Sequence, residues 1–403
     1  MRPCSVVNLP QYVRRVAAAA VMLSTGSCGD QSPRKSPDPQ TTSARASSCR
    51  RDSLEAILRA TLVAMHRRNP VPGLSAALFA RADDLSAAAA VGVSSLTTNR
   101  ALLPSDRFLA GSVGKTFFAA LALRAASRGQ LNLDEPVAGV IRDSGLAAFH
   151  WITPRMLLMH TSGIGEYDTI FMTALVRQPI RERSRDDWLN VIRRSPPNRR
   201  AAGTFRYSDM NYVVLALLLD SVVPHGAYAS IAREFLTPLG LSATAPSVTP
   251  AIAGLVDGYD GAGSMWGRDA MLSNAALIYN PQFEFGGGGF VSTPTDLAKW
   301  LAAFRTGLAF PDSLWPAIVA RPAGVPDTAR SWHGIGVNVG RGSLGLHVGH
   351  SGYMPGYASW VRWYDSLGVS IALQTNAADT LRLRDDGFEW LDSIATRVGA
   401  RCR

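Results

Sequence analysis

The chain has 403 residues, of which 47% are hydrophobic and 18% charged, and this supply of apolar side chains excludes a largely disordered protein. No apolar run reaches the roughly 18–20 residues of a membrane-spanning helix, which excludes a polytopic membrane protein. The formal net charge of +10 suggests a polyanionic partner, but half of it, +5, falls within residues 1–50. The remaining charge is thinly spread, and we therefore expect no nucleic-acid partner.

The first residues of the chain have the pattern of a secretory signal peptide. Arg14 and Arg15 precede a short apolar stretch, residues 16–23, and small residues follow up to Cys28. A basic segment, an apolar segment of about 7–15 residues and a small-residue cleavage site define such a leader, which we predict over residues 1–28. The alternative is an ordinary amphipathic first helix.

The end of this leader suggests a lipid anchor. The segment Thr25–Cys28 is similar to a lipoprotein cleavage box, although Thr25 stands where Leu is usual, and Cys28 would carry the lipid. Residues 29–49 are rich in Ser, Pro and Thr, as expected of a flexible tether. We therefore expect an exported protein of the periplasm or cell envelope, attached to a membrane only through this anchor.

Two of the four cysteines lie at the ends of the expected domain. Cys49 precedes it, and Cys402 is one residue from the end of the sequence. In an oxidising compartment such a pair suggests a disulfide that ties the first helix to the last. Neither cysteine has His and Asp neighbours, so we do not expect zinc.

Residues 50–403 are expected to form one two-lobed domain. In chain order, the hydrophobic patterns predict a helix over 53–68, strands over 74–80 and 87–94, helices over 116–127, 154–160, 186–194, 212–222 and 227–239, strands over 334–339, 344–349, 358–364 and 369–375, and a helix over 384–398. This order favours an α/β (α+β) fold. One antiparallel sheet would be built from both chain ends and flanked by the terminal helices, with an all-helical lobe inserted at about 117–280. A binding cleft is expected between the lobes.

The most informative motif places Ser112 three residues before Lys115, one of three lysines among 41 basic residues. If Ser112 opens a helix, this spacing puts both side chains on one face, about 5–6 Å apart at Cβ. A helix N-terminus also favours negative charge on the serine oxygen. Lysine can accept a proton only when its pKa is lowered, whereas arginine cannot be tuned in this way.

Two other interpretations of this segment remain. Ser112 could cap the helix, with Lys115 on the surface. Alternatively, Gly114-Lys115-Thr116 could end a phosphate-binding loop, but Leu109 occupies the position where that loop requires Gly.

A second motif, Tyr207-Ser208-Asp209, precedes a predicted helix. Residues two apart in an extended segment point the same way, so Tyr207 and Asp209 would face one site. A tyrosine whose pKa is lowered by a nearby lysine can serve as a general base. The alternative is helix capping by Ser208 or Asp209 with aromatic packing by the tyrosine.

A third motif, His350-Ser351-Gly352-Tyr353, lies at a predicted strand edge. The backbone N–H groups of Tyr353 and Ser112 could together form an oxyanion hole. His347 and His350 also raise the question of a metal. Three residues apart on a strand they would face opposite sides, and no carboxylate accompanies them, so we expect neither a metal nor another cofactor.

In this order the three motifs resemble the serine β-lactamase and DD-peptidase superfamily, in its class C-like branch. That branch includes class C β-lactamases, D-alanyl-D-alanine carboxypeptidases, D-amino-acid-specific peptidases and family VIII esterases, and its pattern is S-x-x-K, Y-x-N, then K-T-G or H-x-G. The segments 130–137, 157–164 and 286–297 extend the resemblance from about residue 52 to 397. His160 matches a structural position of the family.

The resemblance implies a β-lactamase/transpeptidase-like fold and a serine hydrolase that forms an acyl-enzyme. Ser112 looks like the acylated nucleophile, with Lys115 and Tyr207 as its proton-transfer partners. The resemblance also implies that Asp209 orients Lys115 and the substrate, that His350, Ser351 and Gly352 line the substrate-binding strand edge, and that the amides of Ser112 and Tyr353 bind the oxyanion.

Two departures from the family pattern bear on the substrate. Asp209 replaces the usual Asn and adds a negative charge, while His350 replaces the Lys of K-T-G with a pH-sensitive group. Carboxylate-bearing substrates would find a weaker fixed attraction, which favours carboxypeptidase-like or esterase-like activity. A weak class C-type β-lactamase and a non-catalytic, penicillin-binding-like envelope protein remain as alternatives. We expect a monomer that acts on a small-molecule or peptide substrate.

Overall fold

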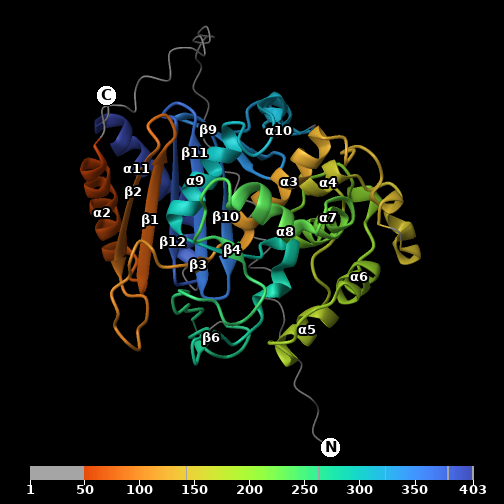
Figure 1. The fold of residues 1–403 in the computed structure, drawn as a ribbon, viewed down its shortest axis with the longest axis horizontal. Coiled ribbons are helices and arrows are strands. Elements are labelled where there is room, and N and C mark those ends of the chain that lie inside the picture. Colours follow the sequence, from red (N-terminus) through yellow and green to blue (C-terminus); the bar gives the residue numbers. More distant parts are fainter. Residues whose placement is uncertain (1–49, 142, 262–263, 323, 379–380, 402–403) are drawn as a thin grey trace, which may run out of the picture.

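The computed structural model describes residues 50–401, apart from residues 142, 262–263, 323 and 379–380 (Figure 1). The predicted signal peptide and tether lie outside the described residues. So do the candidate lipidation site Cys28 and both cysteines of the predicted disulfide, Cys49 and Cys402.

A seven-stranded antiparallel sheet forms the centre of the molecule, with the strand order β2-β1-β12-β11-β10-β9-β8. Its strands are β1 (Gly73–Ala80), β2 (Leu85–Gly92), β8 (Ser331–His333), β9 (Asn338–Gly342), β10 (Gly345–Met354), β11 (Tyr357–Tyr364) and β12 (Val369–Thr375). Leu74 pairs with Thr375, so the two ends of the chain meet in the middle of the sheet. The predicted antiparallel sheet built from both chain ends is confirmed.

Helices cover both faces of this sheet. Helices α2 (Arg51–Arg68) and α11 (Leu381–Arg401) pack on one face, and α9 (Pro294–Arg305) crosses the other (Figure 1). Because side chains alternate along a strand, Ile371 of β12 packs in the core beneath α2 and α11, whereas its neighbour Ala372 packs in the core on the α9 side. A strand buried on both faces is largely apolar, as β1 is apart from the buried Ser75.

The helical region lies on the α9 side of the sheet. Its helices are α3 (Lys115–Ser127), α4 (Pro154–Leu158), α5 (Thr169–Arg177), α6 (Arg185–Arg194), α7 (Asp209–Val222) and α8 (Ala227–Ile231), and α8 continues in a π-helical segment, Ala232–Leu236. Helix α7 is buried over most of its length and forms the axis of this region. Among the described residues no single helix is long and apolar enough to cross a membrane, although α7 and Ala227–Leu236 meet the length and composition criteria as a pair bent by 78°.

Short elements connect these layers. They comprise a small sheet of β3 (Phe108–Leu109), β7 (Phe290–Ser292) and β4 (Ala245–Pro246), the pair β5 (Leu272–Ser273) and β6 (Ala276–Leu277), helix α10 (Trp315–Ile318), and 3-10 turns at Gly111–Gly114, Val137–Gly139, Ser144–Phe149, Arg199–Ala201, Pro281–Gly287 and Asp312–Leu314. The β3–β7 pairing matters most, because it brings the start of α3 beside the glycines that precede β7.

Helices α5 and α9 were not among the predicted elements. Both begin with recognisable caps: Asp168 accepts a hydrogen bond from Phe171 N, and Thr293 accepts one from Asp296 N, with Pro294 at the first helical position. Both the apolar periodicity and these capping residues are visible in the sequence, so the two helices could have been predicted.

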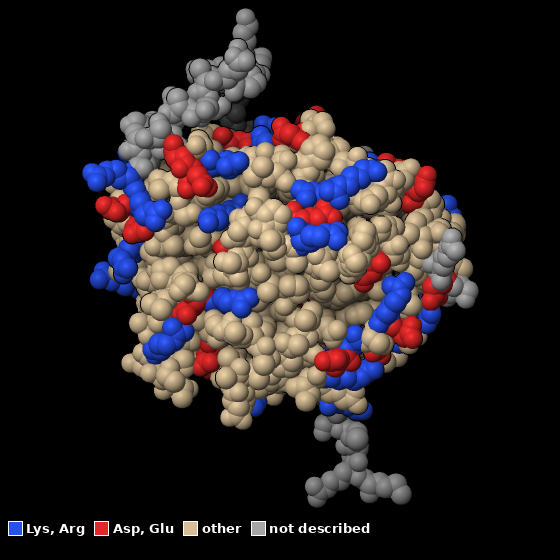
Figure 2. Space-filling model, viewed as in Figure 1, with Lys and Arg blue, Asp and Glu red and all other residues tan. Residues whose placement is uncertain are grey.

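Charged side chains are interspersed on the visible surface. Figure 2 shows basic and acidic residues side by side on this face, with no continuous basic stripe.

Candidate active site

Ser112 lies in the 3-10 turn Gly111–Gly114, which leads directly into α3. Strand β10 packs against this turn so closely that side chains are excluded on both sides. A β-carbon on Gly111, whose φ is +54°, would lie 2.5 Å from Tyr353 N, and one on Gly352 would lie 1.9 Å from Ala110 O and 3.0 Å from Ser112 N. Because both positions are glycine, the turn and β10 come into direct backbone contact. The backbone nitrogens of Ser112 and Tyr353 both lie at this contact.

Lys115 is completely buried at the first position of α3. Its Nζ donates hydrogen bonds to Ser112 Oγ at 2.9 Å, to Asp209 Oδ1 at 2.6 Å and to the carbonyl oxygen of Gly287. An ammonium group has three N–H donors and a neutral amine has only two. These three contacts match the three N–H donors of an ammonium group, and the 2.6 Å ion pair with Asp209 Oδ1 favours that charged form of Lys115.

The pKa of Lys115 is consistent with this geometry. Burial alone would lower the pKa, but the negative charge of Asp209, the charges that Tyr207 and Glu284 carry when they are ionised, and the hydrogen bond to Asp209 raise it above the ordinary lysine value. The proton-acceptor role considered for this lysine requires a lowered pKa. In the resting site Lys115 instead holds its proton.

Tyr207 lies over this ammonium group. Lys115 Nζ is 5.1 Å from the centre of the Tyr207 ring, and the ring stacks on His160 with centroids 4.3 Å apart. Burial raises the pKa of Tyr207; the charge of Lys115 and hydrogen bonds with Lys115 and Ser112 lower it only in part. The lowered pKa predicted from the motif is not found, because burial outweighs the charge of Lys115 and the resting phenol is neutral.

Asp209 is the first residue of α7, where the free N–H groups of a helix favour an anion. It is buried, and its backbone N–H donates to Glu166 Oε1 at 3.1 Å. A third carboxyl, that of Glu284, is also buried nearby. Burial, with the charge of Asp209, raises the pKa of Glu166 and raises that of Glu284 to about 8.

The sequence analysis did not single out these two glutamates. Glu166 lies just after the 157–164 segment, and Glu284 lies two residues before the run Gly286–Gly289. Neither position forms a motif with Ser112, and only the folded chain brings them near Lys115.

The β10 edge opposite the lysine carries no fixed charge. His350 is buried, and its Nδ1 donates to Ser351 O at 2.6 Å. Burial, followed by the charges of Lys115 and His333, lowers the pKa of His350 to about 3, so the imidazole is neutral instead of pH-sensitive around neutrality. Beyond it, the Tyr353 hydroxyl donates to Asp260 Oδ1 at 2.9 Å.

Two further buried histidines stand behind Tyr207. The His160 ring lies 4.9 Å from that of His333, which in turn lies 6.2 Å from that of His350. His347 instead packs near Tyr364 in the core beneath α2 and α11, so the expectation that it faces away from His350 is correct. Within the described ranges no group of three or more His, Cys, Asp or Glu side chains is arranged to hold a metal ion.

The structure therefore brings the three predicted motifs together around Ser112. The nucleophile candidate lies between a buried, charged cluster and an uncharged strand edge, which is the arrangement of a serine hydrolase site built between a sheet and a helical region. The family model named Beta-lactamase matches residues 58–395, and the chain belongs to this family.

Similar solved structures support the same fold. D-amino acid amidase from Ochrobactrum anthropi SV3, in complex with D-phenylalanine, is 21% identical, with a TM-score of 0.72 over 87% of this chain and 100% of the amidase. D-stereospecific amidohydrolase from Streptomyces sp. is 22% identical, with a TM-score of 0.68 over 82% and 95%. Penicillin binding protein from Bacillus halodurans is 18% identical, with a TM-score of 0.67 over 82% and 99%. The β-lactamase/transpeptidase-like fold is thus established, and the chain is a serine hydrolase of the beta-lactamase family.

Proposed function

We propose that this serine hydrolase cleaves small amides or esters through an acyl-enzyme on Ser112, with carboxypeptidase-like or esterase-like activity. The observation that carries the proposal is the hydrogen bond from the buried Lys115 ammonium to Ser112 Oγ, beside the glycine-lined edge of β10. In this arrangement the serine oxygen is oriented by a fixed charge, and a carbonyl group can approach from the open strand edge.

The geometry suggests how the proton moves. Because Lys115 donates to Ser112 Oγ, the serine must donate its own proton elsewhere, and Tyr207 is the adjacent acceptor. The phenolate form of Tyr207 takes this proton as Ser112 Oγ attacks the carbonyl carbon. The nearby lysine charge stabilises that phenolate, which compensates for its low population.

The remaining steps use the same groups. The N–H groups of Ser112 and Tyr353 would bind the oxyanion of the tetrahedral intermediate. Tyr207 then returns the proton to the departing amine or alcohol as the bond to the carbonyl carbon breaks. A water molecule releases the acyl group in the reverse sequence, with Tyr207 again accepting the proton.

The substrate class follows from the charge at the strand edge. Neutral His350 offers no fixed cation to a substrate carboxylate, so neutral amides and esters are favoured over β-lactams. A D-Ala-D-Ala peptide also ends in a carboxylate, so of the two proposed activities the carboxypeptidase-like one should be the slower. Among amides, D-amino acid amides are the first class to test, because two similar structures are named as D-specific amide hydrolases. We further propose that the enzyme acts as an exported monomer of the periplasm or cell envelope. Fractionation of cells and sedimentation of the purified chain test these two points.

A labelling and turnover experiment with Ser112→Ala tests the function. The wild-type protein should react with a fluorophosphonate probe and turn over p-nitrophenyl acetate, a D-amino acid amide or a D-Ala-D-Ala peptide, with a cephalosporin as the slow substrate. Ser112→Ala should lose all labelling and at least ~10³-fold in kcat/KM. Ser127→Ala, at the other end of α3, is the matched control and should behave as wild type.

The outcomes separate the alternatives. Full labelling of Ser112→Ala would falsify the nucleophile assignment. A wild-type protein that binds penicillin but turns over no substrate would instead be a binding protein, and preferential cephalosporin hydrolysis would make it a β-lactamase.

A further inference from the structure

Glu284 is a buried carboxyl that takes no part in the proposed acylation and deacylation steps. It belongs to the 3-10 turn Pro281–Gly287, and only 4% of the residue is exposed. Its Oε2 has no hydrogen-bond partner among the described residues. An unpartnered carboxyl oxygen in the interior is costly, and such a group keeps its proton unless a cation compensates it.

Only glycine backbone separates this carboxyl from the reacting groups. A β-carbon on Gly288 would lie 2.5 Å from Glu284 Oε2 on one side and 2.8 Å from Gly111 O on the other. A β-carbon on Gly287 would lie 3.5 Å from the same Oε2 and 3.4 Å from Asp209 Cβ. The glycines therefore keep the space between Glu284 and the Ser112 turn free of side chains, and Gly287 O itself accepts a hydrogen bond from Lys115.

The charges around Glu284 come from four other elements. Lys115 of α3 is the cation, and Asp209 of α7 is its direct partner at 2.6 Å. Glu166, from the segment after α4, contributes a second carboxyl, and Tyr228 of α8 contributes a phenol, which burial keeps neutral by raising its pKa. One buried cation can compensate one anion, so Asp209 holds the negative charge and the pKa of Glu284 is raised.

We propose that Glu284 is a positioning residue that acts through Lys115. While the carboxyl of Glu284 is protonated, Lys115 and Asp209 form a pair with no net charge. Ionised Glu284 adds a negative charge that keeps a proton on the Lys115–Tyr207 pair and slows acylation of Ser112. On ionisation the proton leaves Glu284 for solvent, and no other group is consumed. The inference deepens the proposed function and rests on it.

The direction of the effect follows from electrostatics. Ionised Glu284 raises the pKa of Lys115, so the deprotonated, reactive form of the Lys115–Tyr207 pair becomes rarer. The wild-type acylation rate should rise with pH and then flatten near pH 8, where Glu284 ionises. Without that carboxyl the rise should continue.

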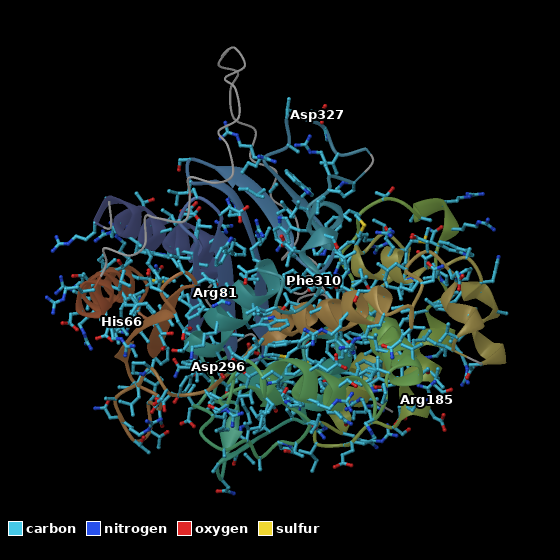
Figure 3. All side chains as sticks on the ribbon, turned by 45° about the horizontal axis from the view of Figure 1, so that its top comes forward. His66, Arg81, Arg185, Asp296, Phe310 and Asp327 are labelled. Atoms are coloured by element: carbon cyan, nitrogen blue, oxygen red, sulfur yellow. The ribbon has the colours of Figure 1, made fainter. Side chains whose placement is uncertain are left out.

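The test compares the pH dependence of fluorophosphonate acylation in the wild type and in Glu284→Gln. Glu284→Gln keeps the shape of the side chain, and its rate should match wild type near pH 6 and exceed it about three- to tenfold near pH 9.5. Glu284→Asp keeps a titratable group and should retain an inflection. Asp296→Asn is the matched control, because Asp296 is a buried carboxyl with a raised pKa at the start of α9 (Figure 3). Its hydrogen-bond donors are Ala243 N and Thr244 Oγ1.

Infrared difference spectroscopy provides a readout that needs no activity. Subtracting the spectra of Glu284→Gln from those of the wild type removes the band of Glu166, whose pKa is also raised. The remaining band, from protonated Glu284, should be present at pH 6 and lost by pH 10. If Glu284→Gln does not fold, the wild-type band and the inflection in Glu284→Asp still decide the matter. A uniform loss of rate at every pH, or a wild-type profile without an inflection, would overturn the inference. A wild-type protein that is never labelled would overturn the proposed function, while the infrared titration still reports on Glu284.

Discussion

The two sides of Ser112 are built on opposite electrostatic principles. On the helical side Lys115, Asp209, Glu166 and Glu284 form a buried cluster in which one cation and several carboxyls compensate one another. On the sheet side the edge of β10 presents backbone groups, glycine and a neutral imidazole. Under the proposed function, proton transfer would depend on the helical side, and the sheet edge would select the substrate by its charge. Substitutions on the two sides should therefore have different signatures.

The largest effect is expected for Lys115→Arg on the charged side. Arginine keeps the charge, but its larger head group does not fit a completely buried site with three acceptors, and it cannot exchange its proton. We expect a loss of at least ~10²-fold in kcat, measured with p-nitrophenyl acetate. Lys299→Arg on α9 serves as the control and should retain activity. Wild-type turnover by Lys115→Arg would show that proton transfer does not depend on Lys115.

Asp209→Asn should have an intermediate effect on the rate. Asparagine keeps the shape of the Asp209 side chain but removes its negative charge. The lysine loses its anionic partner but keeps a neutral acceptor, so the pKa of Lys115 should fall and the rising limb of the rate profile should move to lower pH. We also expect the free energy of unfolding to drop by about 1–3 kcal/mol at pH 7 by chemical denaturation.

The stability effect has a defined pH window. Because the folded pKa of Lys115 is raised above its unfolded value, the pair stabilises the fold fully below the ordinary lysine pKa. That stabilisation is lost only as pH rises through the folded value. Asp134→Asn removes the exposed pair with Arg155 and should cost less than ~1 kcal/mol. An equal loss in the free energy of unfolding of Asp209→Asn and Asp134→Asn would contradict the prediction that the buried pair stabilises the fold more than the exposed pair.

The smallest effect is expected for His350→Lys on the uncharged side. A cation at this position should raise the ratio of cephalosporin to neutral-ester kcat/KM by about tenfold without moving the pH profile of ester hydrolysis. His347→Lys places the same charge on the same strand but on the opposite face and provides the comparison. If both variants leave the substrate ratio unchanged, the strand edge does not select substrate charge.

The sequence predicted the nucleophile region and most of the sheet, because those signals are local. The strand predicted over 334–339 was wrong in its bounds, because residues 334–337 form the turn between β8 and β9. Alternation defined β11 and β12, and a spacing of three residues was enough to place Ser112 beside Lys115. The directions of the pKa shifts were not accessible in the same way. The pKa of Tyr207 depends on burial against His160, and only tertiary packing determines that burial.

The same limit explains the residues that were missed. Glu284 is 169 positions from Lys115 in the chain, and only the β3–β7 pairing brings its glycine segment to the start of α3. His333 likewise lies in the site through the packing of β8 against Phe205 and His160, without a motif of its own.

The pairing of β1 with β12 has a consequence for how the chain folds. Leu74 and Thr375 are about 300 residues apart, so β1 cannot pair with β12 until the roughly 300 residues between them have been synthesised. Until then β1, which is buried along its entire length in the native state, has a free edge that can pair with other chains. Folding of such a topology is expected to be slow and to occur late, and newly made chains would be most prone to aggregation just before β12 emerges from the ribosome.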